Sequence, residues 1–253
     1  MYKVQRRPEK EMIFGIRALL EAIKSGKMIE KILLRRDMSS QLSHELFAAA
    51  NAENIPVQKV PLEKLNQLTS KNHQGAVAFI SPVEFQSLEN IVPALFEQGK
   101  NPFVIVLDGI TDVRNFGAIA RTAQCGGVDA IVVPAARSAA INADAIKTSA
   151  GALLTIPVCR TQNLKNALLF LSQSGLEIIA VTEKTDINYT TISYTNPLAL
   201  VFGAEDEGIS PEILNMCNKK VAIPLCGTIE SLNVSVAAGI AMYEVVRQRK
   251  NQE

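Results

Sequence analysis

Three polar segments of this chain carry the side chains best suited to chemistry. They supply two amides, a guanidinium, a carboxylate and a hydroxyl: Asn115, Arg121, Glu205, Ser231 and Asn233. Each segment follows a short apolar run, and in a parallel sheet ligands bind beyond the carboxyl ends of the strands. The segments therefore predict one site at that edge of a sheet. The simpler alternative is that the polar side chains only cap helix starts.

The arginine has two explanations. Arg121 falls in a predicted helix turn among small apolar residues, where a guanidinium is costly unless it is paired. It could form an ion pair with Glu205 or with an acidic group of a partner chain. It could instead clamp a phosphate or a substrate. For Asp108 and Asp112 we expect loop caps and Asx turns.

The usual nucleotide and metal motifs are absent from the sequence. No G-x-G-x-x-G follows the first strand of the second half, and no G-K-[ST] motif occurs. The two histidines, His44 and His73, are not near a cysteine, so no metal site is expected. We interpret His73 as a loop residue without a catalytic role.

Cysteine usage and hydropathy favour a cytoplasmic protein. The four cysteines are scattered without a C-x-x-C pair, which is typical of reduced thiols. No apolar run reaches the roughly 18 residues of a membrane span. The first ten residues lack the apolar core of a signal peptide.

Charge is divided unevenly along the chain. Residues 1–82 hold 13 lysines and arginines against 8 acidic residues, whereas the rest holds 13 against 17. A basic first part suggests a module that grips a polyanion such as nucleic acid. A solvated surface with a flexible tail would give the same numbers.

The first part of the chain is predicted to be a small α/β domain over residues 13–82, preceded by a flexible basic arm over residues 1–12. Helices are expected over 13–23, 40–53 and 61–68, and strands over 31–35, 56–60 and 76–80. Residues 83–100 read as a linker that contains a weak helical pattern over 88–98.

Residues 101–253 form the second predicted domain. Its apolar runs do not alternate, which indicates parallel strands buried on both faces. Strands are expected over 103–107, 130–133, 177–181, 198–202 and 221–223, and helices over 115–125, 142–151 and 162–173. The segment 232–246 is apolar on nearly every face, which predicts a buried helix.

The three segments together resemble the motifs of the SpoU (TrmH) family of RNA ribose 2′-O-methyltransferases in the SPOUT superfamily. They read N-x-G-x-x-x-R-T-A over 115–123, G-x-E-x-x-G over 203–208, and I-P-x-x-G followed by S-L-N-V-S-x-A over 223–237. The first motif departs from the family's usual D-P-x-N, since Val113 replaces the proline. Residues 13–82 also resemble the ribosomal-L30-like (L30e-like) substrate-binding domain of many members.

The resemblance implies an α/β fold in which a C-terminal SPOUT trefoil-knot domain, a parallel sheet with helices on both faces, follows the small L30e-like domain. It also implies S-adenosylmethionine (S-adenosyl-L-methionine) as cofactor, no metal, and a homodimer with sites at the subunit interface. Catalytic roles fall on Arg121, Asn115, Glu205, Ser231 and Asn233. Cofactor contacts fall on Gly203, Gly208, Ile223, Leu225 and Leu232.

The implied reaction is attack of a ribose 2′-hydroxyl on the cofactor methyl group. The two-domain layout looks most like the branch that acts on a guanosine of large-subunit (23S) rRNA. Arg121 is a poor base because a guanidinium stays protonated in proteins. The family's proposed mechanism nevertheless gives the hydroxyl proton to Arg121. A second role is that Arg121 clamps the adjacent phosphate and stabilises the alkoxide while phosphate or water takes the proton. We expect Arg121 to be essential in either role, with Glu205 holding it. The alternatives are a tRNA ribose or another rRNA site as acceptor, a non-catalytic RNA-binding assembly protein, and a nicotinamide enzyme, which the missing fingerprint disfavours.

Overall fold

The structure, a computed structural model, describes residues 12–251 and divides into two compact units. One unit extends to Val83 and includes Ile141–Ala143, and the other holds Glu84–Ala140 and the chain from Asp144 onward. The basic arm expected over residues 1–12 lies outside the described residues, apart from Met12. Within residues 12–251, no helix has the length and apolar character to cross a bilayer.

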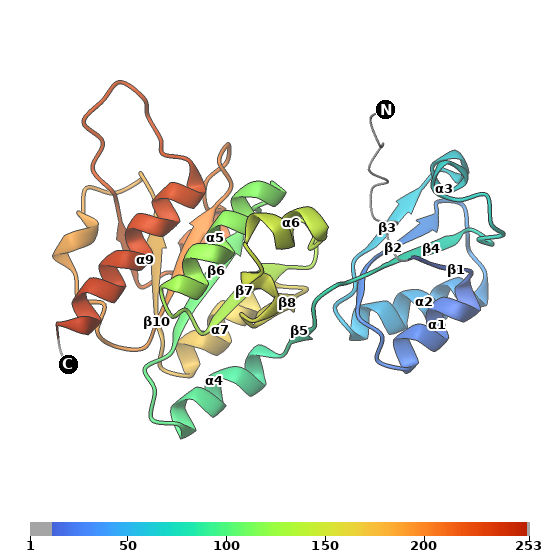
Figure 1. The fold of residues 1–253 in the computed structure, drawn as a ribbon, viewed down its shortest axis with the longest axis horizontal. Helices are drawn as coiled ribbons and strands as arrows, with labels where there is room; N and C mark the ends of the chain where they lie inside the picture. Colours follow the sequence, from blue (N-terminus) through green and yellow to red (C-terminus); the bar gives the residue numbers. More distant parts are fainter. Residues whose placement is uncertain (1–11, 252–253) are drawn as a thin grey trace, which may run out of the picture. The chain divides into compact units, whose positions relative to one another are not determined.

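The first unit is a mixed four-stranded sheet between helices (Figure 1). The strand order is β1-β4-β2-β3, in which only β2 and β3 run parallel. Helices α1 and α2 pack on one face of the sheet and α3 on the other. The elements are β1 (Met12–Phe14), α1 (Ile16–Lys24), β2 (Ile29–Arg35), α2 (Gln41–Ala52), β3 (Val57–Val60), α3 (Leu62–Leu68) and β4 (Ala76–Ile80).

The helix predicted from residue 13 begins later, because its first residues belong to β1. Met12, Ile13 and Phe14 pair antiparallel with β4. Gly15, with φ of 86°, then turns the chain into α1. The helical spacing of the sequence holds from Ile16 onward, and a three-residue strand is too short for its own pattern to stand out.

His73 has the structural role that its loop position suggested. The ring is buried, and Nδ1 accepts a hydrogen bond from the backbone N–H of Gly75 at 3.0 Å. This leaves Nε2 to donate to Oδ1 of Asn66 at 2.9 Å. Both ring nitrogens are thus used in closing the turn before β4.

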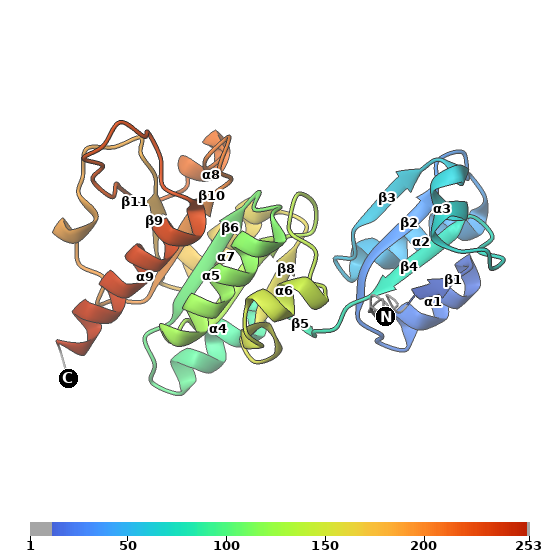
Figure 2. The ribbon, with the colours of Figure 1, turned by 45° about the horizontal axis from the view of Figure 1, so that its top comes forward.

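The second unit is a seven-stranded parallel sheet in the order β11-β9-β10-β6-β7-β8-β5. Helices α5 and α9 pack together over one face, and α7 packs with α4 and α8 over the other (Figures 1 and 2). The elements are β5 (Phe85–Gln86), α4 (Leu88–Glu97), β6 (Phe103–Asp108), α5 (Val113–Cys125), β7 (Ala130–Pro134), α6 (Ala143–Thr148), β8 (Val158–Thr161), α7 (Leu164–Gln173), β9 (Glu177–Val181), β10 (Leu198–Gly203), α8 (Pro211–Leu214), β11 (Lys219–Val221) and α9 (Val234–Lys250).

The parallel sheet with helices on both faces is confirmed, but residues 83–100 are not a free linker. They contain β5, which pairs with β8, and α4, whose Leu88, Val92 and Leu95 are buried in the second unit's core. The strands β5 and β8 were missed because they are short and partly polar. The helix expected over 142–151 ends at Thr148, because Ala150 and Gly151 adopt positive φ.

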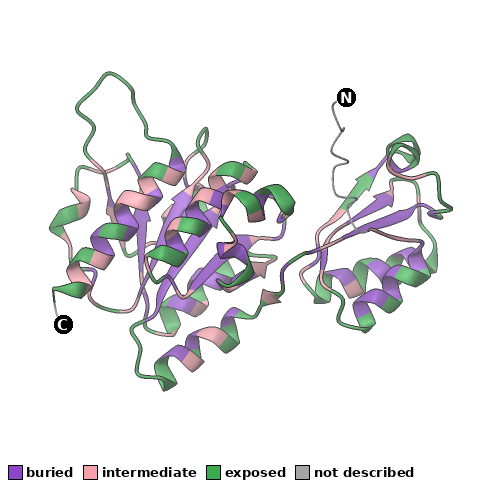
Figure 3. Ribbon diagram, in the orientation of Figure 1, coloured by how far each residue is buried: buried purple, intermediate pink, exposed green. Residues whose placement is uncertain are grey.

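Helix α9 is not buried all round, so that prediction was wrong. Buried and exposed residues are interleaved along α9 (Figure 3). Ala238, Met242 and Val245 are buried against α5 and the sheet, whereas Val236 and Tyr243 are 50% and 51% exposed. A helix packed on one side of a sheet can bury only one stripe in its own chain. The apolar character of the opposite stripe therefore needs a separate explanation.

The last turns of α9 fasten the connection between β9 and β10. Arg249 donates hydrogen bonds to the carbonyls of Asn101 at 2.8 Å, Asn196 at 2.9 Å and Tyr194 at 3.2 Å. Gln248 accepts from the backbone N–H of Tyr194 at 2.9 Å. Burial lowers the pKa of the Arg249 guanidinium, so these hydrogen bonds offset a desolvation cost.

Replacing Arg249 tests this fastening. Arg249→Ala should lower the free energy of unfolding by about 3 kcal/mol, because partly buried carbonyls lose a charged donor. Lys250→Ala, a change at the exposed neighbour, should stay within about 0.5 kcal/mol of the wild type. Urea denaturation followed by circular dichroism measures both. Equal midpoints for the two variants would contradict the proposed fastening.

Candidate functional site

The structure brings Asn115, Glu205 and Asn233 together at the carboxyl edge of the parallel sheet. The amide nitrogen of Asn233 donates to Oδ1 of Asn115 at 3.0 Å and also to Oε1 of Glu205. Its amide oxygen accepts from the backbone N–H of Ser235 at 3.0 Å, which caps α9. One side chain therefore fixes the starts of two helices and the loop after β10.

Two aspartates fix the start of α5 and the loop after β10. Oδ1 of Asp112 accepts from the backbone N–H groups of Arg114 at 2.7 Å and Asn115 at 3.0 Å, which caps α5. Oδ2 of Asp108 accepts from the N–H of Ser210 at 2.8 Å and ties the loop after β10 to the end of β6. The predicted capping role of Asp112 is confirmed. Asp108 differs from the prediction, because it makes a contact across 102 positions of the chain instead of a local cap or Asx turn.

A cleft of about 310 Å³ opens beside this cluster. Its wall combines the loop after β6, the start of α5, the loop after β10 and the first residue of α9. The lining residues are Gly109, Ile110, Thr111, Asp112, Asn115, Ala204, Glu205, Asp206 and Val234. The cleft is thus polar and rich in carboxylates, and we call it the acidic cleft.

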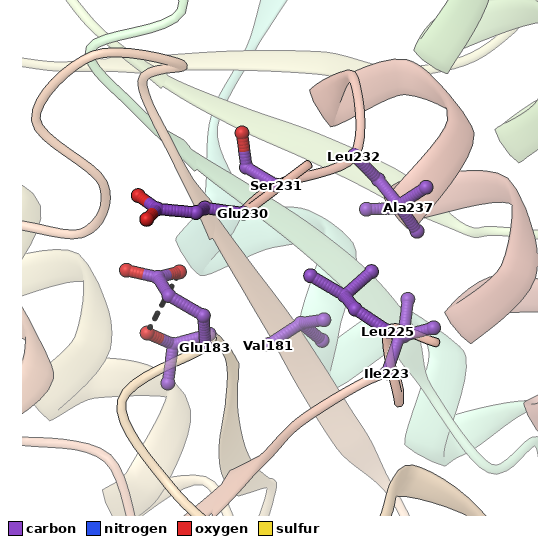
Figure 4. A pocket seen from close by; sticks show the side chains of 9 residues that line it. Val181, Glu183, Ile223, Leu225, Glu230, Ser231, Leu232 and Ala237 are labelled. Carbon is purple, nitrogen blue, oxygen red and sulfur yellow. Dashed lines mark hydrogen bonds between the residues drawn. The ribbon is translucent and has the colours of Figure 1, made fainter. Parts of the chain in front are cut away.

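A second pocket, of about 90 Å³, is lined in part by the segment that leads into α9. Figure 4 shows its apolar side chains gathered on one side and the carboxylates of Glu183 and Glu230 on the other. The lining residues are Val181, Thr182, Glu183, Ile223, Leu225, Glu230, Ser231, Leu232 and Ala237. We call this the apolar pocket.

The two cavities share a wall. Residues 230–232 line the apolar pocket, Val234 lines the acidic cleft, and Asn233 lies between them in the chain. The chain segment 230–237 therefore contributes to both cavities and places two bound reactants beside the same stretch of chain. Such an arrangement suits transfer of a small group between two bound reactants.

Ser231, Ile223, Leu225 and Leu232 gather at the apolar pocket, whereas Gly203 and Gly208 do not line either cavity. A Cβ at Gly203 would lie 2.0 Å from the carbonyl carbon of Gly208, and Gly208 has φ of +70°. The N–H of Gly208 donates to the carbonyl of Ala204 at 2.9 Å. A tight turn explains both glycines.

Arg121 does not join the cluster in its own chain. It lies six positions after Asn115, which places it about 9 Å further along α5 and on a different side of the helix. It is exposed, and among the described residues it makes no ion pair with Glu205. The carboxylate of Glu205 accepts a hydrogen bond from the Asn233 amide instead. The expected ion pair between Glu205 and Arg121 is therefore absent among residues 12–251.

Sequence reasoning missed the contribution of β9. Thr182 and Glu183 follow this apolar strand directly and line the apolar pocket. Oγ1 of Thr182 donates to the Glu183 carboxylate at 3.5 Å. The rule that ligands bind beyond carboxyl strand ends would have found them, because Glu177–Val181 was already identified as a strand.

Comparison with protein families matches both parts of the chain. The SpoU rRNA Methylase family profile matches residues 102–243, and the profile described as RNA 2′-O ribose methyltransferase substrate binding matches residues 12–86. The first match alone spans more than half of the chain and contains all three motifs.

Individual proteins agree with this result. A Staphylococcus saprophyticus protein named for the TrmH family of tRNA/rRNA methyltransferases is 37% identical over 241 residues, covering 95% of this chain and 97% of the relative. The AviRb SpoU methyltransferase from Streptomyces viridochromogenes superposes with a TM-score of 0.62 at 21% identity, covering 97% and 91%. An AdoMet-bound rRNA methyltransferase from Sinorhizobium meliloti gives 0.60 at 23%, covering 93% and 86%. At these identities the two structures show a shared fold.

The turn after β10 can be tested at its first glycine. Gly203→Ala should lower the free energy of unfolding by about 3 kcal/mol, because the added methyl overlaps the backbone at Gly208 and Ile209. Gly227→Ala is the matched control, since a Cβ there meets nothing within 4 Å. Urea denaturation gives both values. A wild-type midpoint for Gly203→Ala would show that the turn is not closely packed.

Proposed function

The chain belongs to the SpoU rRNA Methylase family, and from this premise we propose that it methylates the 2′-hydroxyl of a ribose in structured RNA. The methyl donor in this proposal is S-adenosylmethionine. The observation that carries the proposal is the segment 230–237, which contributes to both the apolar pocket and the acidic cleft and whose Asn233 binds Asn115 and Glu205.

The apolar pocket has the chemistry that this cofactor requires. Leu225, Leu232 and Ile223 offer apolar walls to an adenine ring, and Ser231 offers a hydroxyl. The carboxylates of Glu183 and Glu230 on the opposite side suit the cofactor's positive charges (Figure 4). When bound, the cofactor supplies an electrophilic methyl group on a sulfonium.

The protein's task is then to place the poorer reactant, the ribose hydroxyl. Asn115 offers an amide group at the acidic cleft that can orient a ribose, and Asn233 holds Asn115 and Glu205 in place through its amide hydrogen bonds. Positioning of this kind supplies a large part of the rate enhancement in transfer reactions. The hydroxyl proton leaves to a phosphate or to water, because a guanidinium is a poor base.

We further propose a homodimer that uses the exposed stripe of α9. Val236 and Tyr243 on α9 and Ile229 before it are exposed large apolar side chains, and exposed apolar patches mark association surfaces. Arg121 belongs to α5, which packs against α9. In the dimer, Arg121 would act at the partner's site, where it clamps a phosphate and stabilises the developing alkoxide.

The N-terminal unit is proposed to grip the RNA. Nζ of Lys71 lies 5.4 Å from the centre of the Phe14 ring, and Nζ of Lys31 lies 5.4 Å from that of Phe79, on the sheet face that α3 covers. The lysine charges suit contacts with RNA phosphates. The acceptor proposed is a guanosine of large-subunit rRNA in the cytoplasm, with tRNA as the alternative.

The path of the chain after β9 also supports the trefoil knot that the family resemblance implies. The last strand, β11, adds to the sheet beside β9, and α9 then returns to pack against α5 near the start of the unit. Between these steps the chain contacts the connection after β9, since the N–H of Tyr189 donates to the carbonyl of Ala222 at 2.9 Å.

Radiolabelled S-adenosylmethionine tests the function directly. We expect transfer of label to RNA from a strain lacking this protein, confined to the large rRNA fraction and recovered as an alkali-resistant dinucleotide. Label in tRNA instead would select the tRNA alternative. Absence of label from every fraction, including ribosome precursors, together with no cofactor binding by calorimetry, would leave the non-catalytic RNA-binding role.

Substitution of Arg121 tests whether each site is built from residues of both subunits. Arg121→Ala and Asn115→Ala should each lower kcat by at least about a hundredfold with little loss of stability, because an oriented polar group in the transition state is lost. An equal mixture of the two variants, unfolded and refolded together, should recover about a quarter of wild-type activity, since half of the dimers would hold one intact site.

The refolded mixture of the two variants can also contradict the proposal that Arg121 acts at the partner's site. If Arg121 acts within its own chain, the mixed dimers stay as inactive as either variant alone. Gln124→Ala, a change at another exposed residue of α5, should keep wild-type activity in the same assay.

A further inference from the structure

Arg137 has an unusual backbone at the edge of the acidic cleft. It follows β7, at the same carboxyl edge of the sheet as the cleft, and its φ is 58°. Residues with a side chain rarely adopt this left-handed region, and those that do are often found at functional sites. The loop is held in place by the N–H of Ala139, which donates to the carbonyl of Ile110 at 2.7 Å.

The guanidinium of Arg137 lies over the rim of the cleft. A Cβ built on Gly109, which lines the cleft, would lie 3.8 Å from Nη2 of Arg137. The same nitrogen donates to the carboxylate of Glu207, which follows the cleft residue Asp206. Both side chains of this ion pair are more than 60% exposed. An exposed pair of this kind is weak and can exchange its partner.

The charges around the cleft create a problem for an anionic substrate. Asp112, Glu205 and Asp206 line it, and a phosphodiester that approaches them would be repelled. The hydrogen bond and charge of Glu207 raise the pKa of Arg137, and the charges of Asp108 and the cleft residue Asp206 raise it more weakly. A permanently charged guanidinium at this rim can offset the repulsion.

We propose that Arg137 binds a phosphodiester of the RNA beside the ribose that enters the acidic cleft. In the protein without RNA, the carboxylate of Glu207 occupies the position on the guanidinium that this phosphate would take. This assignment rests on the proposed function. The exchange replaces a carboxylate by a phosphate on the same guanidinium, whose planar fork fits both. No bond is made or broken, so Arg137 is a positioning residue rather than a catalytic one.

The experiment measures RNA binding and cofactor binding separately. Wild type and variants are titrated with deproteinised large-subunit rRNA and with total tRNA by filter retention over a series of potassium chloride concentrations. Arg137→Ala should weaken binding of the preferred RNA about tenfold and reduce the slope of log affinity against log salt by about one. S-adenosylmethionine affinity, measured by calorimetry, should not change.

Two further variants and a control separate the effect of the guanidinium charge from the effect of the backbone conformation at residue 137. Arg137→Gly removes the guanidinium but keeps a residue that adopts positive φ freely, so it should match Arg137→Ala. Glu207→Gln frees the guanidinium and should bind RNA at least as tightly as the wild type. Lys165→Ala, which breaks the exposed Lys165–Glu212 pair (Nζ to Oε2, 2.6 Å), is the matched control and should keep wild-type affinity.

Several results would overturn the proposal. Wild-type RNA affinity in Arg137→Gly would do so, as would a loss in Glu207→Gln equal to that in Arg137→Ala. A loss of cofactor affinity with RNA binding intact would move Arg137 to the cofactor site. If wild type methylates RNA while Arg137→Ala binds that RNA normally, only this inference fails. If wild type binds no RNA, the proposed function fails with it.

Discussion

The side-chain amide of Asn233 is the interaction on which the site depends. Its oxygen accepts a hydrogen bond from the backbone N–H of Ser235 in the first turn of α9. Its nitrogen donates to Asn115 at the start of α5 and to Glu205 after β10. Those three segments are separated by up to 118 positions in the chain. Because an amide offers both donors and an acceptor, one residue can fix all of them at once. The cross-link therefore ties two residues that line the acidic cleft to the segment that also lines the apolar pocket.

Packing around the cross-link leaves little freedom. The turn after β10 folds back so closely that Gly203 has no room for a Cβ, and Asp108 holds the far end of that loop at Ser210. Glu205 is therefore presented by a rigid turn rather than by a mobile loop. Rigid presentation matters for methyl transfer, because small misplacements of a reacting group are costly. The carboxylates of Asp112, Glu205 and Asp206 also give the cleft negative charge, which opposes the approach of a phosphodiester.

Helix α9 joins the site to the rest of the second unit. Its first residue lines the acidic cleft, its middle is buried on α5, and its last turns hold the connection after β9 through Arg249 and Gln248. The stripe that faces away from the unit keeps exposed apolar side chains such as Val236 and Tyr243. A second copy of the chain on that stripe would explain why the sequence is apolar on nearly every face. In this view, stability, association and the site all depend on one helix.

The sequence by itself determined the two-part α/β organisation, the parallel second sheet, the capping role of Asp112, and the gathering of Asn115, Glu205 and Asn233 at the carboxyl edge. These follow from local patterns and from the rule that parallel strands present their ends together. Only the tertiary structure decided that Asn233, not Arg121, meets Glu205, because helical geometry carries Arg121 away from Asn115. It also decided that Gly203 and Gly208 serve a turn, that β9 supplies Thr182 and Glu183, and that Arg137 stands at the cleft. Such contacts join residues far apart in the chain, and no local pattern encodes them.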